Sequence, residues 1–241
     1  MAKAFFISDV HLGLGAFEKE KAKEERVVGF LQHVREHGSA LFIVGDLFDS
    51  WLEYRTVVPK GYHRLLTALE DLTRSGIEVH YLAGNHDFWM RDLFHRHLRI
   101  NTYSKPFSIT IEGKKFFFHH GDGLIDNDWG YLILQAILRN PLCVWLYSWI
   151  HPDIGVRLAQ FSSRGSRRHT EKMSNYSDSG LRDFAAKMIG QGYDFVVMGH
   201  CHKPKIERMG SGTYVNLGDW ISYNSYAEFQ DGHLELKTWN P

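Results

Sequence analysis

The chain has 241 residues, of which 44% are hydrophobic and 23% are charged, and these values are typical of a globular protein. This length predicts one α/β domain spanning residues 1–241 and is too short for two ordinary domains joined by a linker. Lys and Arg together number 28, as do Asp and Glu, so the formal net charge is zero, which disfavours a nucleic-acid-binding protein.

The first 120 residues predict an alternation of strands and helices, which is typical of a layered α/β fold. The strands are short apolar runs, and the first carries no charge, as expected of a strand that is covered on both faces. Each helix shows a stripe of apolar residues and is followed by a glycine. In chain order we predict a strand over Ala4–Ser8, a helix over Glu18–Glu36, a strand over Leu41–Val44, a helix over Lys60–Arg74, a strand over Glu78–Leu82, and two strands joined by a tight turn over Phe107–Ile111 and Phe116–His119.

The rest of the chain contains a segment of different composition. Residues 128–159 are predicted to be helical and are dense in Trp, Tyr, Leu and Ile, whereas residues 162–179 are polar and basic. We therefore predict a helical insertion over about residues 127–175 within the domain. After it come a helix over Leu181–Ile189, a strand over Phe195–Met198, and strand-like runs that alternate with glycine turns over residues 206–239.

Two interpretations of the insertion stay open. The apolar residues 129–150 can form the core of a helical cap, or they can accommodate lipid chains or contact a membrane, and both can hold at once. The longest apolar stretch, residues 141–150, is too short to cross a bilayer. The basic segment from Arg164 to Lys172 is either a solvated surface or a grip for phosphate groups, since guanidinium groups bind phosphate through a planar fork of donors.

Five predicted strands end in the same way, in a loop that carries Asp, Asn or His. Because strands in open α/β sheets border the ligand-binding crevice with their carboxyl ends, we predict that these five ends converge on one site. Any one of these residues is explained equally well as a turn or helix-capping residue, but capping does not account for the ordered set. The groups are Asp9 with His11, Asp46 with Asp49, Asn85 with His86 and Asp87, His120 with Asp122, and His200 with His202.

The chemistry of this set points to metal ions. Carboxylate, imidazole and carboxamide donors without sulfur suit two divalent ions such as Mn²⁺, Fe²⁺ or Zn²⁺ better than a structural zinc, and we favour Mn²⁺. A carboxylate can bridge two ions through its two oxygens, and a two-metal site can activate water and clamp a phosphoryl group. The two cysteines, Cys143 and Cys201, lie far apart, so we expect no disulfide framework, no thiolate site and a reducing compartment. Of His119 and His120, strand alternation turns one away, and we choose His120 because Gly-Asp follows it.

The five blocks form a recognisable series of motifs, namely Asp9-x-His11, Gly45-Asp46-x-x-Asp49, Gly84-Asn85-His86-Asp87, His120-Gly121-Asp122 and Gly199-His200-x-His202. In this order and spacing, over residues 5–220, the series resembles the signature of the calcineurin-like metallophosphoesterase superfamily. The resemblance implies a four-layer α/β/β/α sandwich with a helical cap insertion, and a centre of two divalent metal ions. It implies that Asp9, His11 and His202 hold the first metal, that Asn85, His120 and His200 hold the second, and that Asp46 bridges them.

Within the superfamily, the chain is similar to the UDP-2,3-diacylglucosamine diphosphatase family of lipid A biosynthesis. The similarity rests on the insertion, on residues 45–51 and 85–88, and on residues 120–124 followed by Asp128-x-Gly130-Tyr131. It implies hydrolysis of the pyrophosphate of UDP-2,3-diacylglucosamine to UMP and 2,3-diacylglucosamine 1-phosphate, by attack of water at the α-phosphorus. It also implies a cytoplasmic enzyme that binds a nucleotide-linked glycolipid and lies peripherally on the cytoplasmic face of the inner membrane.

The same resemblance implies roles for residues that do not bind metal. His86 would lie beside the scissile phosphate as a hydrogen-bond donor, oriented by Asp87. The best-known members of the diphosphatase family have Arg at the position of His86, whereas His is the residue of the wider superfamily there. The implied substrate-binding residues are Asp128, Arg164, Ser166 and Arg167, of which Ser166 and Arg167 are aligned only by counting without gaps from Asn140.

Three other functions are weighed against this one. Another metallophosphoesterase, acting on a nucleotide or on a related acylated or apolar substrate, is the nearest alternative, and the apolar insertion argues against simple nucleotides and phosphoproteins. A binding scaffold built on an inactive phosphoesterase fold would lack metal ligands, and none of the motif positions is missing. A nuclease would need a basic groove, which the neutral net charge disfavours.

Overall fold

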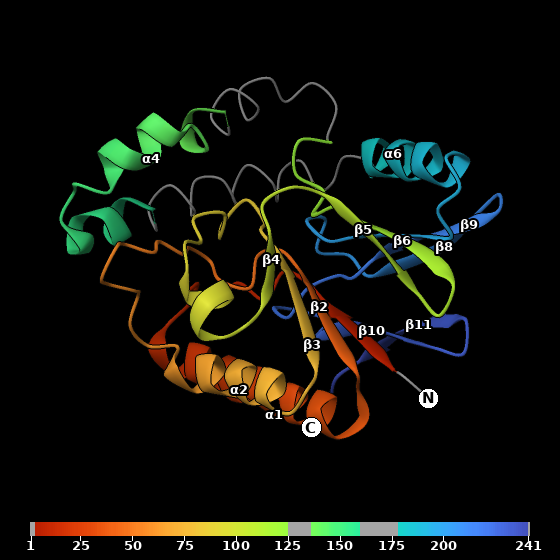
Figure 1. Ribbon diagram of the computed structural model, residues 1–241, viewed down its shortest axis with the longest axis horizontal. Coiled ribbons are helices and arrows are strands. Elements are labelled where there is room, and N and C mark those ends of the chain that lie inside the picture. The colour runs from red at the N-terminus through yellow and green to blue at the C-terminus, as the bar shows by residue number, and fades with distance from the viewer. Residues whose placement is uncertain (1–2, 125–135, 160–177, 241) are drawn as a thin grey trace.

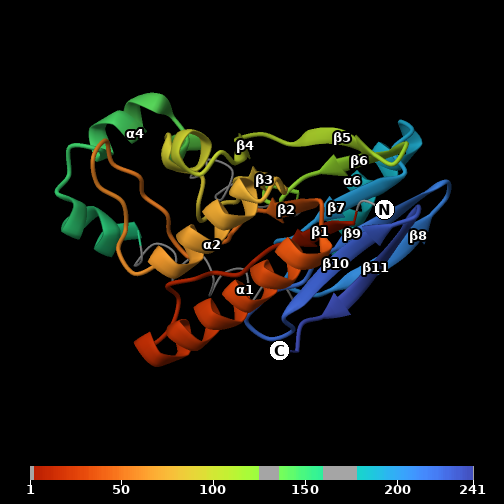
Figure 2. The ribbon, with the colours of Figure 1, turned by 60° about the horizontal axis from the view of Figure 1, so that its bottom comes forward.

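The computed structural model describes residues 3–124, 136–159 and 178–240 of the chain. In this described part, two β-sheets pack face to face, and helices cover the outer face of each sheet (Figures 1 and 2). The layers therefore follow the order α/β/β/α, which confirms the fold class that was predicted from the sequence.

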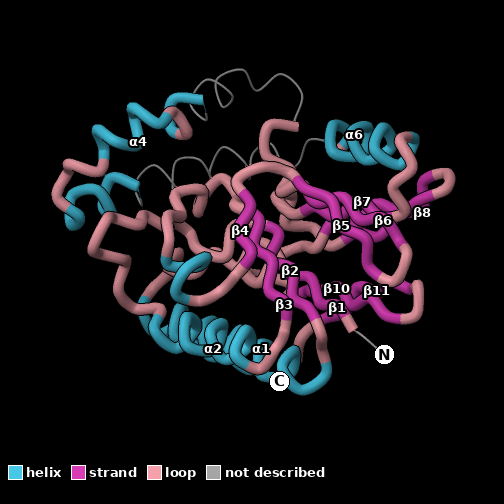
Figure 3. Tube along the Cα trace, viewed as in Figure 1, coloured by secondary structure: helices cyan, strands magenta, loops and turns pink. Residues whose placement is uncertain are grey.

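The first sheet has six strands in the order β11-β10-β1-β2-β3-β4. Strands β1 to β4 run parallel, and β10 pairs antiparallel with β1 on the side away from β2. All four parallel strands therefore end at the same edge of the sheet. The strands of this sheet are drawn in magenta in Figure 3. The strands span Ala4–Ile7 (β1), Ala40–Val44 (β2), Glu78–Leu82 (β3), Asn101–Tyr103 (β4), Ser225–Gln230 (β10) and His233–Thr238 (β11).

The second sheet has five strands in the order β5-β6-β7-β9-β8. Its three central strands, β6, β7 and β9, are parallel, and the two edge strands are antiparallel to their neighbours. The sheet thus also presents several strand ends at one edge. The strands span Phe107–Ile111 (β5), Lys114–Phe118 (β6), Phe195–Met198 (β7), Lys205–Met209 (β8) and Gly212–Asn216 (β9).

The alternation of side chains in β1 holds the layers together. Phe5 and Ile7 face the helices α1 and α2, whereas Phe6 faces the second sheet, because successive side chains of a strand point to opposite faces. Between the sheets, the Phe6 ring stacks on Phe42 and Phe116, with centroids 5.0 and 5.7 Å apart. Each fully buried phenylalanine of this kind contributes about 1.5–3 kcal/mol to the stability of the fold.

The named helices are α1 (Phe17–His37), α2 (His63–Arg74), the π-helix η1 (Leu93–His97), α4 (Pro141–Tyr147) and α6 (Ser179–Gly190).

The second helix begins later than the sequence predicted. It starts at His63 and not at Lys60, because Gly61 adopts φ +109° and Tyr62 adopts φ −112° and ψ 20°, neither of which is helical. The Tyr62 ring instead packs against Phe48, with a centroid distance of 4.9 Å. Two elements were not predicted at all, the short strand β4 and the π-helix η1.

The helix predicted over residues 128–159 is not continuous in its described part. It is divided into residues 136–138, the helix α4, and residues 152–159. Pro141 and Pro152 each open a new helical segment, since proline suits a first helical turn and breaks a helix interior. Among the described helices, none combines the length and the apolar character needed to cross a membrane.

Candidate functional site

The predicted metal ligands lie together at the edge where the parallel strands of both sheets end. Their side chains follow β1, β2 and β3 of the first sheet and β6 and β7 of the second. Three overlapping clusters of possible ligand atoms form there, with the atoms of each cluster within 4.8 Å of one another. The clusters are Asp9 with His11 and His202, Asp46 with His120 and His200, and His11 with Asp46 and His86.

Asp46 lies at the centre of this arrangement. Its Oδ2 is 3.6 Å from Nε2 of His11 and 3.2 Å from Nε2 of His120, so one oxygen faces both halves of the site. Its Oδ1 accepts a hydrogen bond of 2.9 Å from the main-chain N–H of His86. Asn85 belongs to the same half as His120, because its Oδ1 lies 3.0 Å from Nε2 of that histidine. This geometry suits a carboxylate shared between two ions.

The main chain at the ligands adopts an unusual conformation. Five of the predicted ligands have positive φ angles between +48° and +69°, in the left-handed region that residues other than glycine seldom occupy. Such conformations persist only where the surrounding fold enforces them, and they cluster at functional sites. The five residues are Asp9, His11, Asp46, His200 and His202.

Buried polar atoms at the site lack hydrogen-bond partners. Oδ1 of Asp9 and Nε2 of His11 are both buried and make no hydrogen bond to any described residue. The other oxygen of Asp9 accepts hydrogen bonds from Ser8 Oγ at 2.6 Å and from the main-chain N–H of His200 at 2.8 Å, which aims Oδ1 into the cluster. Because a buried polar atom without a partner is costly, these atoms fit direct coordination of a cation.

Three of the histidines are oriented through Nδ1, so that Nε2 faces the site. Nδ1 of His120 donates to the main-chain oxygen of Val44 at 2.9 Å. Nδ1 of His11 lies 3.5 Å from Oδ1 of Asp49, in an ion-pair contact and not a hydrogen bond. Histidines that bind metal are characteristically held by such an acceptor on their second nitrogen.

The contact that orients the third histidine, His202, was not predicted from the sequence. Oδ2 of Asp219 lies 3.3 Å from Nδ1 of His202. Asp219 follows β9, which is parallel to β7, so its loop belongs to the same edge as the other ligand loops. A signal was present in the sequence, because Asp219 follows the apolar run of β9 in the same way as the predicted ligands follow their strands.

The charges of the site are strongly coupled. Burial alone would raise the pKa values of both Asp9 and Asp46, but the neighbouring histidines outweigh it. His202 and His11 hold the pKa of Asp9 at about 2, and His120 and His86 hold the pKa of Asp46 well below its usual range. Both carboxylates are therefore ionised at neutral pH and offer negative charge to cations.

His86 and Asp87 lie beside the cluster in different roles. Nδ1 of His86 lies 3.0 Å from the main-chain oxygen of Asp49, which fixes the ring. The carboxylate of Asp87 was expected to orient His86, but its hydrogen bonds join other groups. Oδ2 accepts from Leu47 N at 2.7 Å and from the hydroxyl of Tyr81, and Oδ1 accepts from Gly84 N at 2.8 Å. Asp87 therefore fastens the loop after β3 to the loop after β2.

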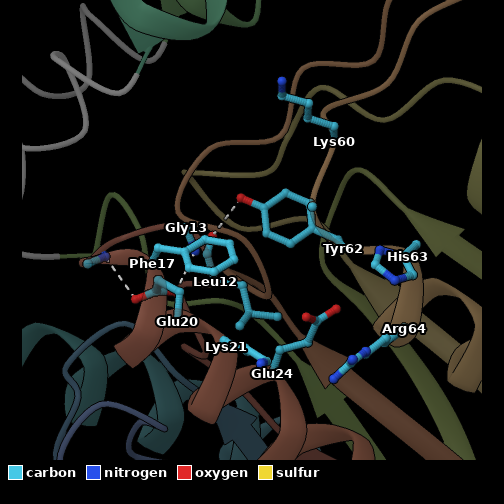
Figure 4. A pocket seen from close by; sticks show the side chains of 12 residues that line it. Leu12, Gly13, Phe17, Glu20, Lys21, Glu24, Lys60, Tyr62, His63 and Arg64 are labelled. Carbon is cyan, nitrogen blue, oxygen red and sulfur yellow. Dashed lines mark hydrogen bonds between the residues drawn. The ribbon is translucent and has the colours of Figure 1, made fainter.

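The loop that follows the first motif is held by α1 and by the start of α2. Oε2 and Oε1 of Glu20 accept hydrogen bonds from the main-chain N–H groups of Gly13 and Gly15, at 2.7 and 2.8 Å. The hydroxyl of Tyr62 lies 3.4 Å from the main-chain oxygen of Leu12 (Figure 4). A cavity of about 430 Å³ lies against this loop. It contains none of the predicted ligands, so we assign it no part in the chemistry.

The predicted substrate-binding residues Asp128, Arg164, Ser166 and Arg167 lie outside the described residues. His119, adjacent to the predicted ligand His120, faces α6, where its ring packs on Phe184 with the ring centroids 5.2 Å apart. Asp122 forms an ion pair with Arg139 at 2.9 Å. The described part of the insertion exposes several large apolar side chains, including Trp145 and Trp149, with 55% and 74% of their surface accessible.

An α/β/β/α sandwich with Asp and His clusters at its strand ends is the architecture of metal-dependent phosphoesterases. The chain belongs to the calcineurin-like phosphoesterase family, which matches residues 2–204. Clusters of this composition, in this family, indicate divalent metal ions as the cofactor.

Two relatives at or above 30% identity carry the same name. The chain is 33% identical to a protein of Porphyromonas gingivalis named UDP-2,3-diacylglucosamine hydrolase, over 98% of this chain and 97% of that one. It is 30% identical to a protein of the same name from Nitrosococcus oceani, over 90% of this chain and 86% of that one. Among solved structures, YfcE, a phosphoesterase from E. coli, has a TM-score of 0.50 at 17% identity, with 99% and 93% of the two chains covered, and this likeness supports the fold.

Proposed function

We propose that this protein hydrolyses the pyrophosphate of UDP-2,3-diacylglucosamine to UMP and 2,3-diacylglucosamine 1-phosphate, a step of lipid A biosynthesis. The observation that carries the proposal is the near full-length similarity to the Porphyromonas gingivalis UDP-2,3-diacylglucosamine hydrolase, combined with the ligand cluster at the strand ends. The family assignment supplies the reaction class, and the relative supplies the substrate.

The residues of the cluster divide into two sets of ligands. Asp9, His11 and His202 would hold one divalent ion, Asn85, His120 and His200 would hold the other, and Asp46 would be shared between them. Mn²⁺ is the ion that we favour for this mixture of oxygen and nitrogen donors, with Fe²⁺ and Zn²⁺ as alternatives. When bound, such a metal pair activates water and neutralises charge on the phosphoryl group.

His86 is proposed to act on the scissile phosphate. Its Nδ1 is engaged by the oxygen of Asp49, so Nε2 faces the cluster that contains His11 and Asp46. Because Nδ1 donates its proton to that oxygen, Nε2 donates a hydrogen bond to the leaving phosphoryl oxygen only in the imidazolium form, which the negative charge of a bound phosphate group favours. Asp87 supports this geometry indirectly, by fixing the loop from which His86 projects.

The exposed apolar surface of the insertion supports an amphiphilic substrate. Leu142, Trp145, Leu146 and Trp149 are all exposed on or just after α4, and large exposed apolar groups of this kind mark sites of lipid or protein contact. We propose that they contact acyl chains or the bilayer that contains the substrate. The protein would then lie peripherally on the cytoplasmic face of the inner membrane. The basic residues Arg164 and Arg167, with Asp128 and Ser166, are proposed to bind the sugar and phosphate.

The histidine at position 86 supports a second candidate function. The best-known diphosphatases have Arg there, so a related acylated or otherwise apolar nucleotide-linked substrate is the alternative. Such a substrate would use the same metal centre and the same exposed surface, and would differ only where His86 meets the phosphate.

An assay with a panel of UDP-sugars decides between these substrates. Purified protein with Mn²⁺ is incubated with UDP-2,3-diacylglucosamine, with its monoacylated and unacylated counterparts, and with UDP-N-acetylglucosamine, and UMP release is measured. We expect release from the diacylated compound only, and none from the variant Asn85→Ala. Equal rates with and without acyl chains would overturn the lipid assignment, and no UMP release from any compound would overturn the pyrophosphatase assignment.

A further inference from the structure

Arg139 lies in the insertion, at the junction of two helical segments. It follows the helical residues 136–138 and precedes Asn140, whose side chain caps α4 by accepting a hydrogen bond of 2.9 Å from Leu142 N. The main-chain N–H of Asn140 also donates to the oxygen of Ile137 at 3.1 Å. A turn on one side and a helix cap on the other thus fix the main chain on either side of Arg139.

The side chain of Arg139 reaches from the insertion to the loops that follow β3 and β6. Its Nη2 lies 2.9 Å from Oδ2 of Asp122 and donates to the main-chain oxygen of Gly84 at 3.2 Å. Its guanidinium carbon also lies 5.8 Å from the centre of the Phe88 ring, within cation–π range. One side chain therefore contacts three residues on two loops.

These partners flank the ligands assigned to the second metal. Gly84 directly precedes Asn85, and Phe88 follows two residues after His86, so Arg139 touches both sides of the loop after β3. Asp122 lies two residues after His120 on the other loop. The ligand atoms of the two loops, Oδ1 of Asn85 and Nε2 of His120, are 3.0 Å apart, so a small relative displacement of the loops separates them.

This contact is partly shielded from solvent. The side chain of Arg139 is 35% exposed and that of Asp122 only 7%, so water screens the pair incompletely. Gly84 is also tightly confined, because a Cβ there would lie 2.1 Å from Oδ1 of Asp46. A shift of Gly84 is thereby transmitted to the shared carboxylate.

We propose that Arg139 is a positioning residue for the second metal site, through which the insertion sets the spacing of Asn85 and His120. The inference deepens the proposed function and rests on its metal centre. It assigns the insertion a part in building that centre, in addition to any contact with acyl chains. Arg139 does not need to touch the substrate for this role.

Metal binding provides the direct test, because it is independent of any substrate. Mn²⁺ is titrated into the metal-free full-length protein by calorimetry, for the wild type, Arg139→Ala, Arg139→Lys and the matched control Arg157→Ala, which removes an exposed arginine of the same insertion. We expect Arg139→Ala to weaken the second Mn²⁺ about 10-fold or more and to leave the first unchanged. Lysine should restore part of the affinity, since it keeps the charge, and Arg157→Ala should match the wild type.

Kinetics on two substrates separate positioning from substrate contact. With the small diester bis(p-nitrophenyl) phosphate, which has no acyl chain, Arg139→Ala should lower kcat at saturating Mn²⁺ and change KM less than about twofold. An unchanged second Mn²⁺ affinity, with only the KM for the acylated substrate raised, would overturn the inference and make Arg139 a substrate contact. Should Arg139→Ala fail to fold, the same metal titration on Arg139→Lys and Arg139→Gln decides whether Arg139 positions the second metal site. If the wild type cleaves neither substrate, the proposed function fails while the titration still tests Arg139.

Discussion

Asp219 holds His202 by one carboxylate oxygen and its own loop by the other. Oδ2 lies 3.3 Å from Nδ1 of His202, whose Nε2 lies 3.4 Å from Oδ1 of Asp9. The second oxygen, Oδ1, accepts three main-chain hydrogen bonds of 2.7 to 3.1 Å, from the N–H groups of Ile221, Ser222 and Tyr223. The carboxylate is therefore fixed and can act only as an acceptor toward the ring.

We expect Asp219→Asn to weaken Mn²⁺ binding at the first site by about 10–100-fold. Asparagine can still accept the three main-chain hydrogen bonds through its oxygen, but it then presents an N–H to Nδ1 of His202. The ring responds by carrying its proton on Nε2, which removes the metal-binding lone pair. Calorimetric titration measures the effect, and Asp231→Asn, in an exposed turn, is the matched control. Unchanged affinity in Asp219→Asn would exclude the orienting role.

Substitutions of His86 and of the second-site ligands should lower turnover for different reasons. We expect Asn85→Ala and His200→Ala to abolish turnover through loss of the second metal. We expect His86→Ala to lower turnover by about 10²–10⁴-fold, the usual contribution of a proton donor, with near-normal metal content. Metal analysis of the purified variants beside steady-state kinetics distinguishes the two. Full activity in His86→Ala would remove its catalytic role.

Gly84 should tolerate no side chain. A Cβ at this position would lie 2.1 Å from Oδ1 and 2.6 Å from the main-chain nitrogen of Asp46. Gly84→Ala should therefore displace the shared carboxylate, and a displacement near 1 Å costs about 10²-fold in rate. Gly190→Ala is the control, because nothing lies within 4 Å of the added carbon there. Turnover in Gly84→Ala equal to that in Gly190→Ala would show that the loops accommodate the methyl group.

Glu53 should be important for stability and not for chemistry. It is buried, and its carboxylate accepts hydrogen bonds of 2.8 Å from the main-chain N–H groups at the start of η1, those of Arg91, Asp92 and Leu93. Glu53→Ala leaves these donors without their acceptor, so we expect the free energy of unfolding to fall by about 1–3 kcal/mol. Urea denaturation measures this. Glu25→Ala removes only an exposed ion pair with Arg64 and should cost less than about 1 kcal/mol.

His80 should make part of the folding stability depend on pH. Burial against the Phe42 ring, at a centroid distance of 4.5 Å, lowers the pKa of His80 below its usual value of 6.5. The unfolded chain therefore binds this proton more readily than the folded protein does. His80 therefore does not reduce the free energy of unfolding above pH 6.5. Below that pH, the free energy of unfolding decreases as the pH falls from 6.5 toward the lower pKa of the folded state. Denaturation of wild type and His80→Phe between pH 5 and 8 should show a smaller pH dependence in the variant, and identical slopes would contradict this.

Apolar runs and the polar residues that follow them were sufficient to predict most of the elements and the chemistry of the predicted ligands. Each strand that contributes a ligand is a short apolar run, so its ends were readable to within a residue or two, and the donor types on the following loops specified divalent metals. The order of the motifs then indicated the family. Local patterns were sufficient because the buried part of each of these strands is apolar and the loop that follows it is polar.

The contacts that hold the predicted ligands in place became apparent from the fold and not from the sequence. Asp87 is adjacent to His86 in the chain, yet it fastens Leu47 and Gly84, and the orienting carboxylate for His202 is Asp219, seventeen residues away. The contact of Arg139 with Gly84 spans 55 residues. These relationships depend on which strands are neighbours in the sheets and on where the insertion meets the core. They are set by packing over long separations, which no local pattern of side chains encodes.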